Sequence, residues 1–147
     1  MSPTKTIFDK IIRREIPAEI VYEDSDVIAF LDISPNNPGH TLVIPKEPSR
    51  NLLDISTDSW SKVMEVVRIL ALKIQKAVDA DGINLMMNNE PFAGQIVMHA
   101  HVHIIPRFKG DGYEHWAGHP YAEGQAKEVA DKIRAQLIKP LSSGTNT

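Results

Sequence analysis

The chain has 147 residues, of which 42% are hydrophobic and 24% charged; it has no cysteine, and its formal net charge at pH 7 is −3. These values fit one globular domain and exclude disulfides and thiolate zinc sites, and the negative charge argues against a nucleic-acid partner. No apolar run approaches the roughly 20 residues of a membrane span and no secretory signal pattern is found, so we expect a cytoplasmic protein without a membrane partner.

The first part of the chain predicts one short helix and three strands. Apolar residues that share one side indicate a helix over residues 7–14, which Pro17 prevents from continuing. Apolar runs separated by turn residues then predict strands over residues 20–23, 27–32 and 40–44.

A long amphipathic helix follows over about residues 57–80, with Ser56, Thr57 and Asp58 as candidate N-caps. Two more strands and a C-terminal helix are predicted over residues 83–88, 97–106 and 123–138. We therefore expect a single α+β domain, residues 1–147, with an antiparallel five-stranded sheet and one long helix on one face. It divides into a core, a C-terminal loop with its helix, and a frayed polar tail, at residues 7–107, 108–140 and 141–147.

Three histidines alternate with apolar residues at His99, His101 and His103. Residues two apart point to the same face of a strand, so the three imidazoles are predicted to line one surface while Ala100 and Val102 face the core. A helix would scatter the rings, and the spacing therefore supports the strand over residues 97–106.

Three interpretations of this row compete. The rings could be sheet histidines without a role, ligands of a metal ion, or a nucleophile with neighbours that set its tautomer and charge. Three of the six histidines within five residues disfavour the first interpretation. No carboxylate lies in the segment to complete a metal site, which disfavours the second. Chemistry alone does not choose between the metal and the nucleophile.

Other segments match a known pattern together with this row. The row itself reads HAHVHII, or His-φ-His-φ-His-φ-φ with φ apolar, and it is accompanied by IFDKII at 7–12, AFLDISP at 29–35, PGHTLVIPK at 38–46 and AGQ at 93–95. This combination resembles the histidine-triad (HIT) superfamily, and most of all its Hint-like branch of purine nucleoside phosphoramidases. The resemblance spans residues 7–107 and implies a HIT-like fold and a nucleotide hydrolase or transferase. It implies no metal and no cofactor.

The resemblance implies roles for four histidines. His101 is expected to attack the α-phosphate and form a nucleotidyl-imidazole intermediate. His99 is expected to orient His101, and His103 to contact the phosphate and help protonate the leaving group. His40 is expected to support the cluster from the neighbouring strand.

Substrate contacts are implied as well, for a purine nucleotide with adenine favoured. The carboxylate of Asp32 suits the two ribose hydroxyls because it accepts two hydrogen bonds, although an Asp at this place could simply begin a turn. Asn88 and Gln95 are expected to contact phosphate oxygens. The apolar slot for the base is expected to be formed by Phe8, Phe30 and Ile33. Asn88 could alternatively cap a strand end, and the three apolar side chains could be plain core.

Two residues depart from the family pattern. Ile96 stands where many relatives carry Ser or Thr, so a hydroxyl near the phosphate is missing. Asp9 stands where some bacterial relatives carry a Cys of a structural zinc site, so that site is expected to be absent.

Three alternatives to this function remain open: a dinucleoside polyphosphate hydrolase, a nucleotide-binding module with weak catalysis, and a metal-dependent hydrolase.

A homodimer is expected from the apolar surface that one domain leaves uncovered. The long helix carries Val66, Ile69 and Leu72 outside its main apolar stripe, and the strand over residues 83–88 is too apolar for an open edge. Pairing both elements across a two-fold axis would cover them, and the resemblance implies the same arrangement.

Overall fold

The computed structural model describes residues 5–137, and these form two compact units that separate between Asp111 and Gly112. The second unit contains helix α3 (Gln125–Leu137), which begins two residues later than expected. The predicted tail at 141–147 and the last residue of the predicted C-terminal helix lie outside the described residues. A single domain over the whole chain stays a prediction.

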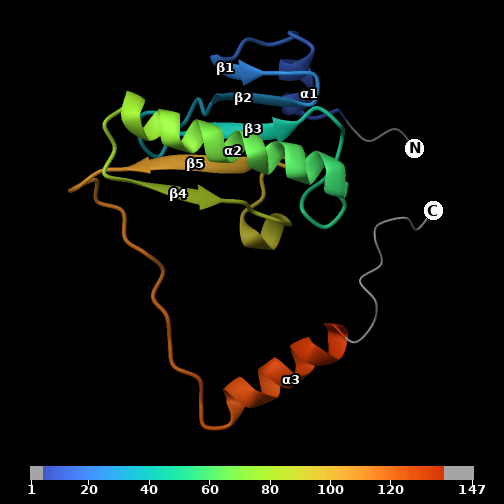
Figure 1. The fold of residues 1–147 in the computed structure, drawn as a ribbon, viewed down its shortest axis with the longest axis vertical. Helices are drawn as coiled ribbons and strands as arrows, with labels where there is room; N and C mark the ends of the chain where they lie inside the picture. Colours follow the sequence, from blue (N-terminus) through green and yellow to red (C-terminus); the bar gives the residue numbers. More distant parts are fainter. Residues whose placement is uncertain (1–4, 138–147) are drawn as a thin grey trace. The chain divides into compact units, whose positions relative to one another are not determined.

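The first unit contains the sheet and the other helices (Figure 1). Its strands pair antiparallel throughout, in the order β1-β2-β3-β5-β4, so that β1 and β4 are the edges. The predicted α+β class and five-stranded antiparallel sheet are confirmed. In chain order the elements are α1 (Ile7–Ile12), β1 (Ile20–Glu23), β2 (Val27–Leu31), β3 (Thr41–Pro45), α2 (Thr57–Ala77), β4 (Gly82–Met86), the 3₁₀ turn η1 (Pro91–Ala93) and β5 (Val102–Arg107).

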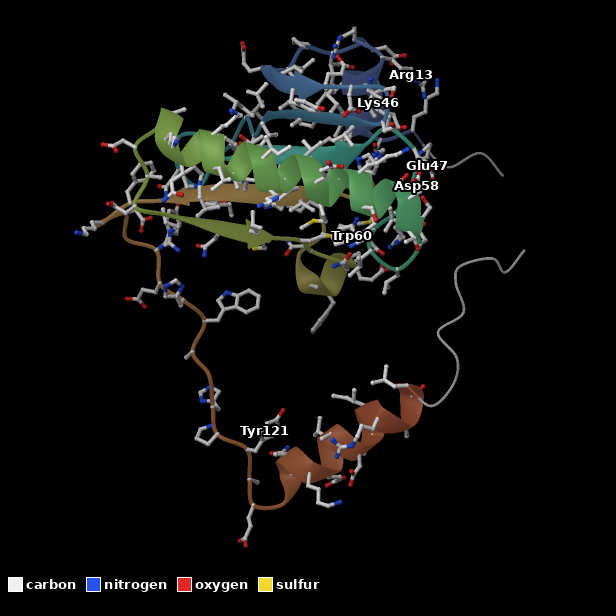
Figure 2. The ribbon with its side chains drawn as sticks, viewed as in Figure 1. Arg13, Lys46, Glu47, Asp58, Trp60 and Tyr121 are labelled. Atoms are coloured by element: carbon white, nitrogen blue, oxygen red, sulfur yellow. The ribbon has the colours of Figure 1, made fainter. Side chains whose placement is uncertain are left out.

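Helix α2 lies across one face of the sheet, as predicted (Figure 1). Ser56 caps its N-terminus by accepting a hydrogen bond from the backbone N–H of Ser59 at 3.2 Å. Its apolar stripe packs on side chains from β2, β3 and β5, and Trp60, labelled in Figure 2, packs partly buried against the same cluster. Val66 belongs to this core and is 8% exposed, so its expected place outside the main stripe is wrong.

The other face of the sheet carries a second apolar cluster, to which α1 contributes. Thr6 and Asp9 form a capping box at the start of α1, which fixes where this short helix begins. The cluster consists of Phe8, Ile11, Ile28, Phe30, Leu42 and Ile44. Because α1 covers this face only in part, room remains beside it for a site.

The histidine row differs from its prediction in one respect. Strand β5 begins at Val102, so His103 lies in the strand while His99 and His101 precede it. The backbone N–H of Ala100 donates to the carbonyl of Ser49 at 2.9 Å instead of continuing the sheet ladder. Val102 still packs under α2, so the predicted division into a core face and a histidine face is preserved.

Within residues 5–137, no helix is both long and apolar enough to cross a membrane.

Candidate active site

A cavity of about 310 Å³ lies on the α1 face of the sheet. Its walls come from α1, the end of β2, the loop after β4 and the histidine row. Seven of the ten predicted site residues line it: Phe8, Phe30, Asp32, Ile33, Asn88, His101 and His103. The pattern-based prediction missed other lining residues, among them Ile11, Leu42, Gly94 and Val97, because nothing local in the sequence marks them as cavity walls.

The aromatic rings at the base of the cavity belong to the core and to its lining at once. Phe8 and Phe30 are 6% and 3% exposed, and their ring centroids lie 5.4 Å apart. The ring of Phe8 also forms a T-shaped pair with the His101 imidazole, with ring centroids 5.0 Å apart. Ile33 is 89% exposed at the rim. An apolar slot of this kind can bury a planar base.

The ring of His101 is held by the backbone two residues before it. Its Nδ1 lies 2.6 Å from the carbonyl oxygen of His99. A carbonyl can only accept, so Nδ1 carries the proton and Nε2 of the neutral ring keeps its lone pair. The nitrogen of His101 that has a free lone pair is therefore Nε2.

His40 and His103 form a directed chain of hydrogen bonds. The backbone N–H of Asn36 donates to Nδ1 of His40 at 3.0 Å, so the proton of that ring is on Nε2. Nε2 of His40 then donates to Nδ1 of His103 at 2.9 Å, which places the His103 proton on Nε2. Among the described residues this buried Nε2–H makes no hydrogen bond. A buried donor without a partner is costly, and an anionic substrate oxygen would satisfy it.

Burial lowers the pKa of all four histidines, because it disfavours the charged imidazolium. The pKa of His103 falls to about 4, since the neighbouring rings of His101 and His40 add to the effect of burial. The four imidazoles are therefore neutral at pH 7, and a neutral imidazole is the nucleophilic form.

Asp32 stands at the end of β2 beside this cluster. One carboxylate oxygen, Oδ1, accepts a hydrogen bond from the N–H of Ser34 at 2.8 Å, so the turn that this residue was expected to begin is present. The other, Oδ2, lies 3.7 Å from Nε2 of His40. Because Asp32 also lines the cavity, its carboxylate keeps acceptor capacity for a substrate hydroxyl.

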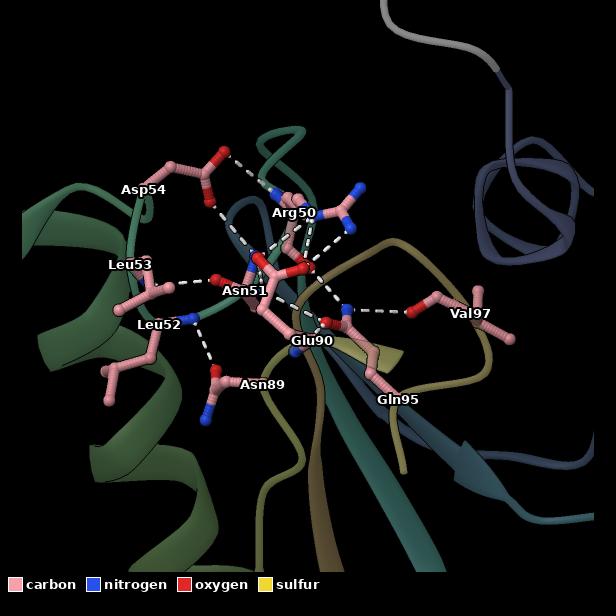
Figure 3. A network of polar contacts seen from close by, with 9 residues as sticks. All are labelled: Arg50, Asn51, Leu52, Leu53, Asp54, Asn89, Glu90, Gln95 and Val97. Carbon is pink, nitrogen blue, oxygen red and sulfur yellow. Dashed lines mark hydrogen bonds and ion pairs between the residues drawn. The ribbon is translucent and has the colours of Figure 1, made fainter. Parts of the chain in front are cut away.

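Asn88 and Gln95 have different environments. Asn88 lines the cavity, and its Nδ2 donates to the Gly94 carbonyl at 3.3 Å. Gln95 is 3% exposed and does not line the cavity. Its Nε2 donates to the carbonyls of Arg50 and Val97 at 2.7 and 3.0 Å, so both amide hydrogens are used within the protein (Figure 3). This corrects the expected phosphate contact: the side chain of Gln95 fixes the loop instead.

His99 has a carboxylate neighbour, Asp9, for which the sequence patterns predicted no contact with the histidines. Its Nε2 donates to the Pro45 carbonyl at 2.7 Å, and its Nδ1 lies 3.7 Å from Oδ1 of Asp9. The other carboxylate oxygen of Asp9 accepts from the N–H and hydroxyl of Thr6 at 2.7 and 3.1 Å. One carboxylate thus caps the helix and also lies near the ring of His99.

Among residues 5–137, one group of side chains could hold a metal ion. Ligand atoms of Asp32, His40 and His103 lie within 4.8 Å of one another. The imidazole nitrogens Nε2 of His40 and Nδ1 of His103 are already hydrogen-bonded to each other, so a metal ion would have to replace that contact.

Comparisons with known proteins agree with this fold. A family model described as the HIT domain matches residues 13–110. The chain is 41% identical to the purine nucleoside phosphoramidase of Escherichia coli (strain K12) over 102 residues, 69% of this chain and 86% of that protein. It is 34% identical to the adenosine 5'-monophosphoramidase of Schizosaccharomyces pombe over 134 residues, 89% and 97% of the two chains. A crystal structure of a protein from Streptococcus mutans UA159 is 42% identical, with a TM-score of 0.86 over 92% of this chain and 87% of that one.

Proposed function

The chain belongs to the HIT domain family, and on this premise we propose that it is a nucleotide hydrolase or transferase. It cleaves a nucleoside 5′-monophosphate, of the AMP type, from an amine, acyl or phosphate leaving group. The observation that carries the proposal is the pair of Nε2 atoms on His101 and His103, whose ring centroids lie 5.0 Å apart. One atom has a free lone pair and the other a free proton, which suits attack on a phosphate.

The reaction follows from these two atoms. Nε2 of His101 forms a bond to the α-phosphorus, the bond from phosphorus to the leaving group breaks, and the leaving group departs with the electron pair and takes up a proton. His103 Nε2–H donates toward the phosphate and the leaving group as charge develops there. Water, or another acceptor, then attacks the nucleotidyl-imidazole, which releases the nucleotide and restores His101.

Binding of the nucleoside uses the remaining walls of the cavity. The base lies against Phe8, Phe30 and Ile33, and Asp32 accepts hydrogen bonds from the ribose hydroxyls. Asn88 contacts the phosphate. An anionic phosphate beside the histidines raises their pKa values again, because an opposite charge favours the imidazolium.

The positions of the cations argue against a second phosphate chain in the substrate. Lys46 pairs with Glu23 at 2.9 Å, and the guanidinium of Arg107 pairs with Asp111 at 2.8 Å. Neither cation lines the cavity. A dinucleoside polyphosphate would need such donors near the histidines, so a mononucleotide with a neutral or small leaving group fits the site better.

The proposal is tested by incubating the protein with adenosine 5′-phosphoramidate and measuring AMP by chromatography, with and without excess EDTA. We expect release of AMP at the same rate in both. No release of AMP would contradict the proposed reaction. Release that stops with EDTA and returns with Zn²⁺ would instead assign the chemistry to a metal ion held by Asp32, His40 and His103.

A further inference from the structure

The loop between β4 and the histidine row, residues 88–97, contains an unusual backbone conformation. Glu90 has φ 78° and ψ 151°, in a region that is populated almost only by glycine because a Cβ clashes there. Two other non-glycine residues with positive φ, Arg14 and Asp79, directly follow the C-caps of α1 and α2, where such a conformation is common. Glu90 has no such context.

Contacts of its side chain and backbone hold Glu90 in this conformation (Figure 3). The carboxylate accepts hydrogen bonds from Nε and Nη2 of Arg50 at 3.2 and 2.7 Å, and from Nδ2 of Asn51 at 3.2 Å. The backbone N–H donates to Oε1 of Gln95 at 2.8 Å, and the carbonyl accepts from the N–H of Ala93 and of Gln95. Every polar group of Glu90 is therefore engaged.

We call the contacts of the Glu90 carboxylate with Arg50 and Asn51 the Arg50–Glu90 clamp. Its strength depends on whether it connects to buried groups. The side chains of Arg50 and Glu90 are 46% and 42% exposed, and an ion pair this exposed is weak by itself. Asn51 is 1% exposed, however, and its Nδ2 also donates to Oε1 of the buried Gln95 at 3.0 Å. Asn89 adds a further tie between the two segments, because its Oδ1 accepts from the N–H of Leu52 at 2.8 Å.

The loop that is held in this way forms one wall of the nucleotide cavity. Asn88, Gly94, Ile96 and Val97 line the cavity together with His101 and His103. Gly94 also has a positive φ, 94°, and a Cβ there would lie 3.3 Å from Nδ2 of Asn88. The loop thus has two positive-φ positions, one filled by glycine and one by a residue with a Cβ.

We propose that the Arg50–Glu90 clamp holds the backbone of residue 90 in its glycine-like conformation and thereby positions the cavity wall formed by Asn88, Gly94 and Ile96 against His101. Arg50, Glu90 and Gln95 are positioning residues in this account. The inference rests on the proposed function, because it assigns the clamp a role in nucleotide turnover.

Glycine and alanine at position 90 separate this role from that of an ordinary surface ion pair. Both Glu90→Ala and Glu90→Gly remove the carboxylate, but alanine keeps the backbone strain and glycine relieves it. We expect Glu90→Ala to lower kcat/KM for adenosine 5′-phosphoramidate by about tenfold or more, mainly through kcat, because small misplacements of a reacting group are costly. Glu90→Gly is expected to stay at least about fivefold above Glu90→Ala.

Arg50 supplies the second arm of the test. Arg50→Ala is expected to reduce kcat/KM in the same way, and adding Glu90→Gly is expected to restore most of the loss. Arg13→Ala is the matched control, because Arg13 forms an ion pair of similar exposure with Glu15 outside the cavity wall. All rates are measured well below the melting temperature of each variant, so that global unfolding does not contribute.

A readout that needs no turnover accompanies the kinetics. The side-chain NH₂ of Gln95 donates to two carbonyls, so its hydrogen exchange is expected to be slow in the wild type and in Glu90→Gly, and fast in Glu90→Ala. Equal kcat/KM and equal exchange in the alanine and glycine variants would overturn the proposal. A wild type that does not release AMP while the exchange pattern holds would refute the proposed function and the catalytic role of the clamp, but not the clamp itself.

Discussion

The Nδ1–H of His101 donates to the backbone carbonyl of His99 over 2.6 Å, and this contact assigns the free lone pair of the His101 ring to Nε2. The same cavity holds the free Nε2–H of His103. The proposed reaction depends on this division of one acceptor and one donor between neighbouring rings.

Removal of the His101 ring tests the nucleophile. We expect His101→Ala to abolish AMP release while nucleotide binding remains, because the side chains expected to hold the nucleoside, Phe8, Phe30 and Asp32, are still present. Steady-state rates and calorimetric titration with AMP measure the two properties separately. Retention of more than a few per cent of the wild-type rate would contradict a covalent mechanism.

Asp32 is tested by the hydroxyls it is expected to hold. A 2′,3′-dideoxy nucleotide should bind the wild type more weakly than the ribonucleotide, by about 1.5–3 kcal/mol for each charged hydrogen bond lost. Asp32→Asn should reduce this discrimination and still accept the turn hydrogen bond from Ser34. Equal affinities of the wild type for the two nucleotides would remove Asp32 from the site.

The lowered pKa of His103 predicts a loss of stability in acid. Its pKa is about 4 in the folded chain and near 6.5 in an unfolded one, so the unfolded state binds more protons as pH falls below 6.5. The contribution of the neutral His103 ring to the free energy of unfolding is fully present above pH 6.5 and is lost as the pH falls through 4. His40, His99 and His101 act with the same sign because burial lowers their pKa values too.

Urea unfolding at pH 7 and at pH 4.5 measures this effect. We expect the wild type to lose more free energy of unfolding than His103→Asn between these pH values, by on the order of 2 kcal/mol. If both proteins lose stability in parallel, His103 is not the group responsible.

The exposed apolar surface on α2 and β4 predicts a homodimer. Ile69 and Leu72 are 49% and 60% exposed, and Leu85 on the edge strand β4 is 50% exposed. Sedimentation equilibrium at micromolar concentration should give twice the chain mass of 16.4 kDa. Leu85→Glu should shift the equilibrium to monomer, whereas Val21→Glu, at a similarly exposed site on the opposite edge strand, should not. A wild-type mass near 16.4 kDa would rule the dimer out.

Periodicity was sufficient to predict the strands of the sheet and its long helix, because the apolar spacing of each element is local. The start of β5 was not predictable in this way. Its position depends on Ser49, whose carbonyl takes the Ala100 N–H that would otherwise extend the ladder. The burial of Val66 was not predictable from the helical pattern either, because it depends on how the helix packs on the sheet.

The contacts of Gln95 were not predictable from its residue type. An amide in a loop before a histidine row is a reasonable phosphate donor, but its partner Asn51 lies 44 positions away in the sequence. The Arg50–Glu90 clamp spans 40 positions and gives no sequence signal at all. The histidines were predictable because their alternation is local, whereas their proton positions required the contacts of Asn36, His40 and His99.

Mass spectrometry of the protein mixed briefly with adenosine 5′-phosphoramidate can detect the proposed nucleotidyl-imidazole on His101. We expect a mass increase equal to one adenylyl group, located on His101 by peptide fragmentation and missing in His101→Ala. Turnover by the wild type with no adduct at any mixing time, or an adduct on His99 or His103 instead, would contradict the assignment of His101 as the nucleophile.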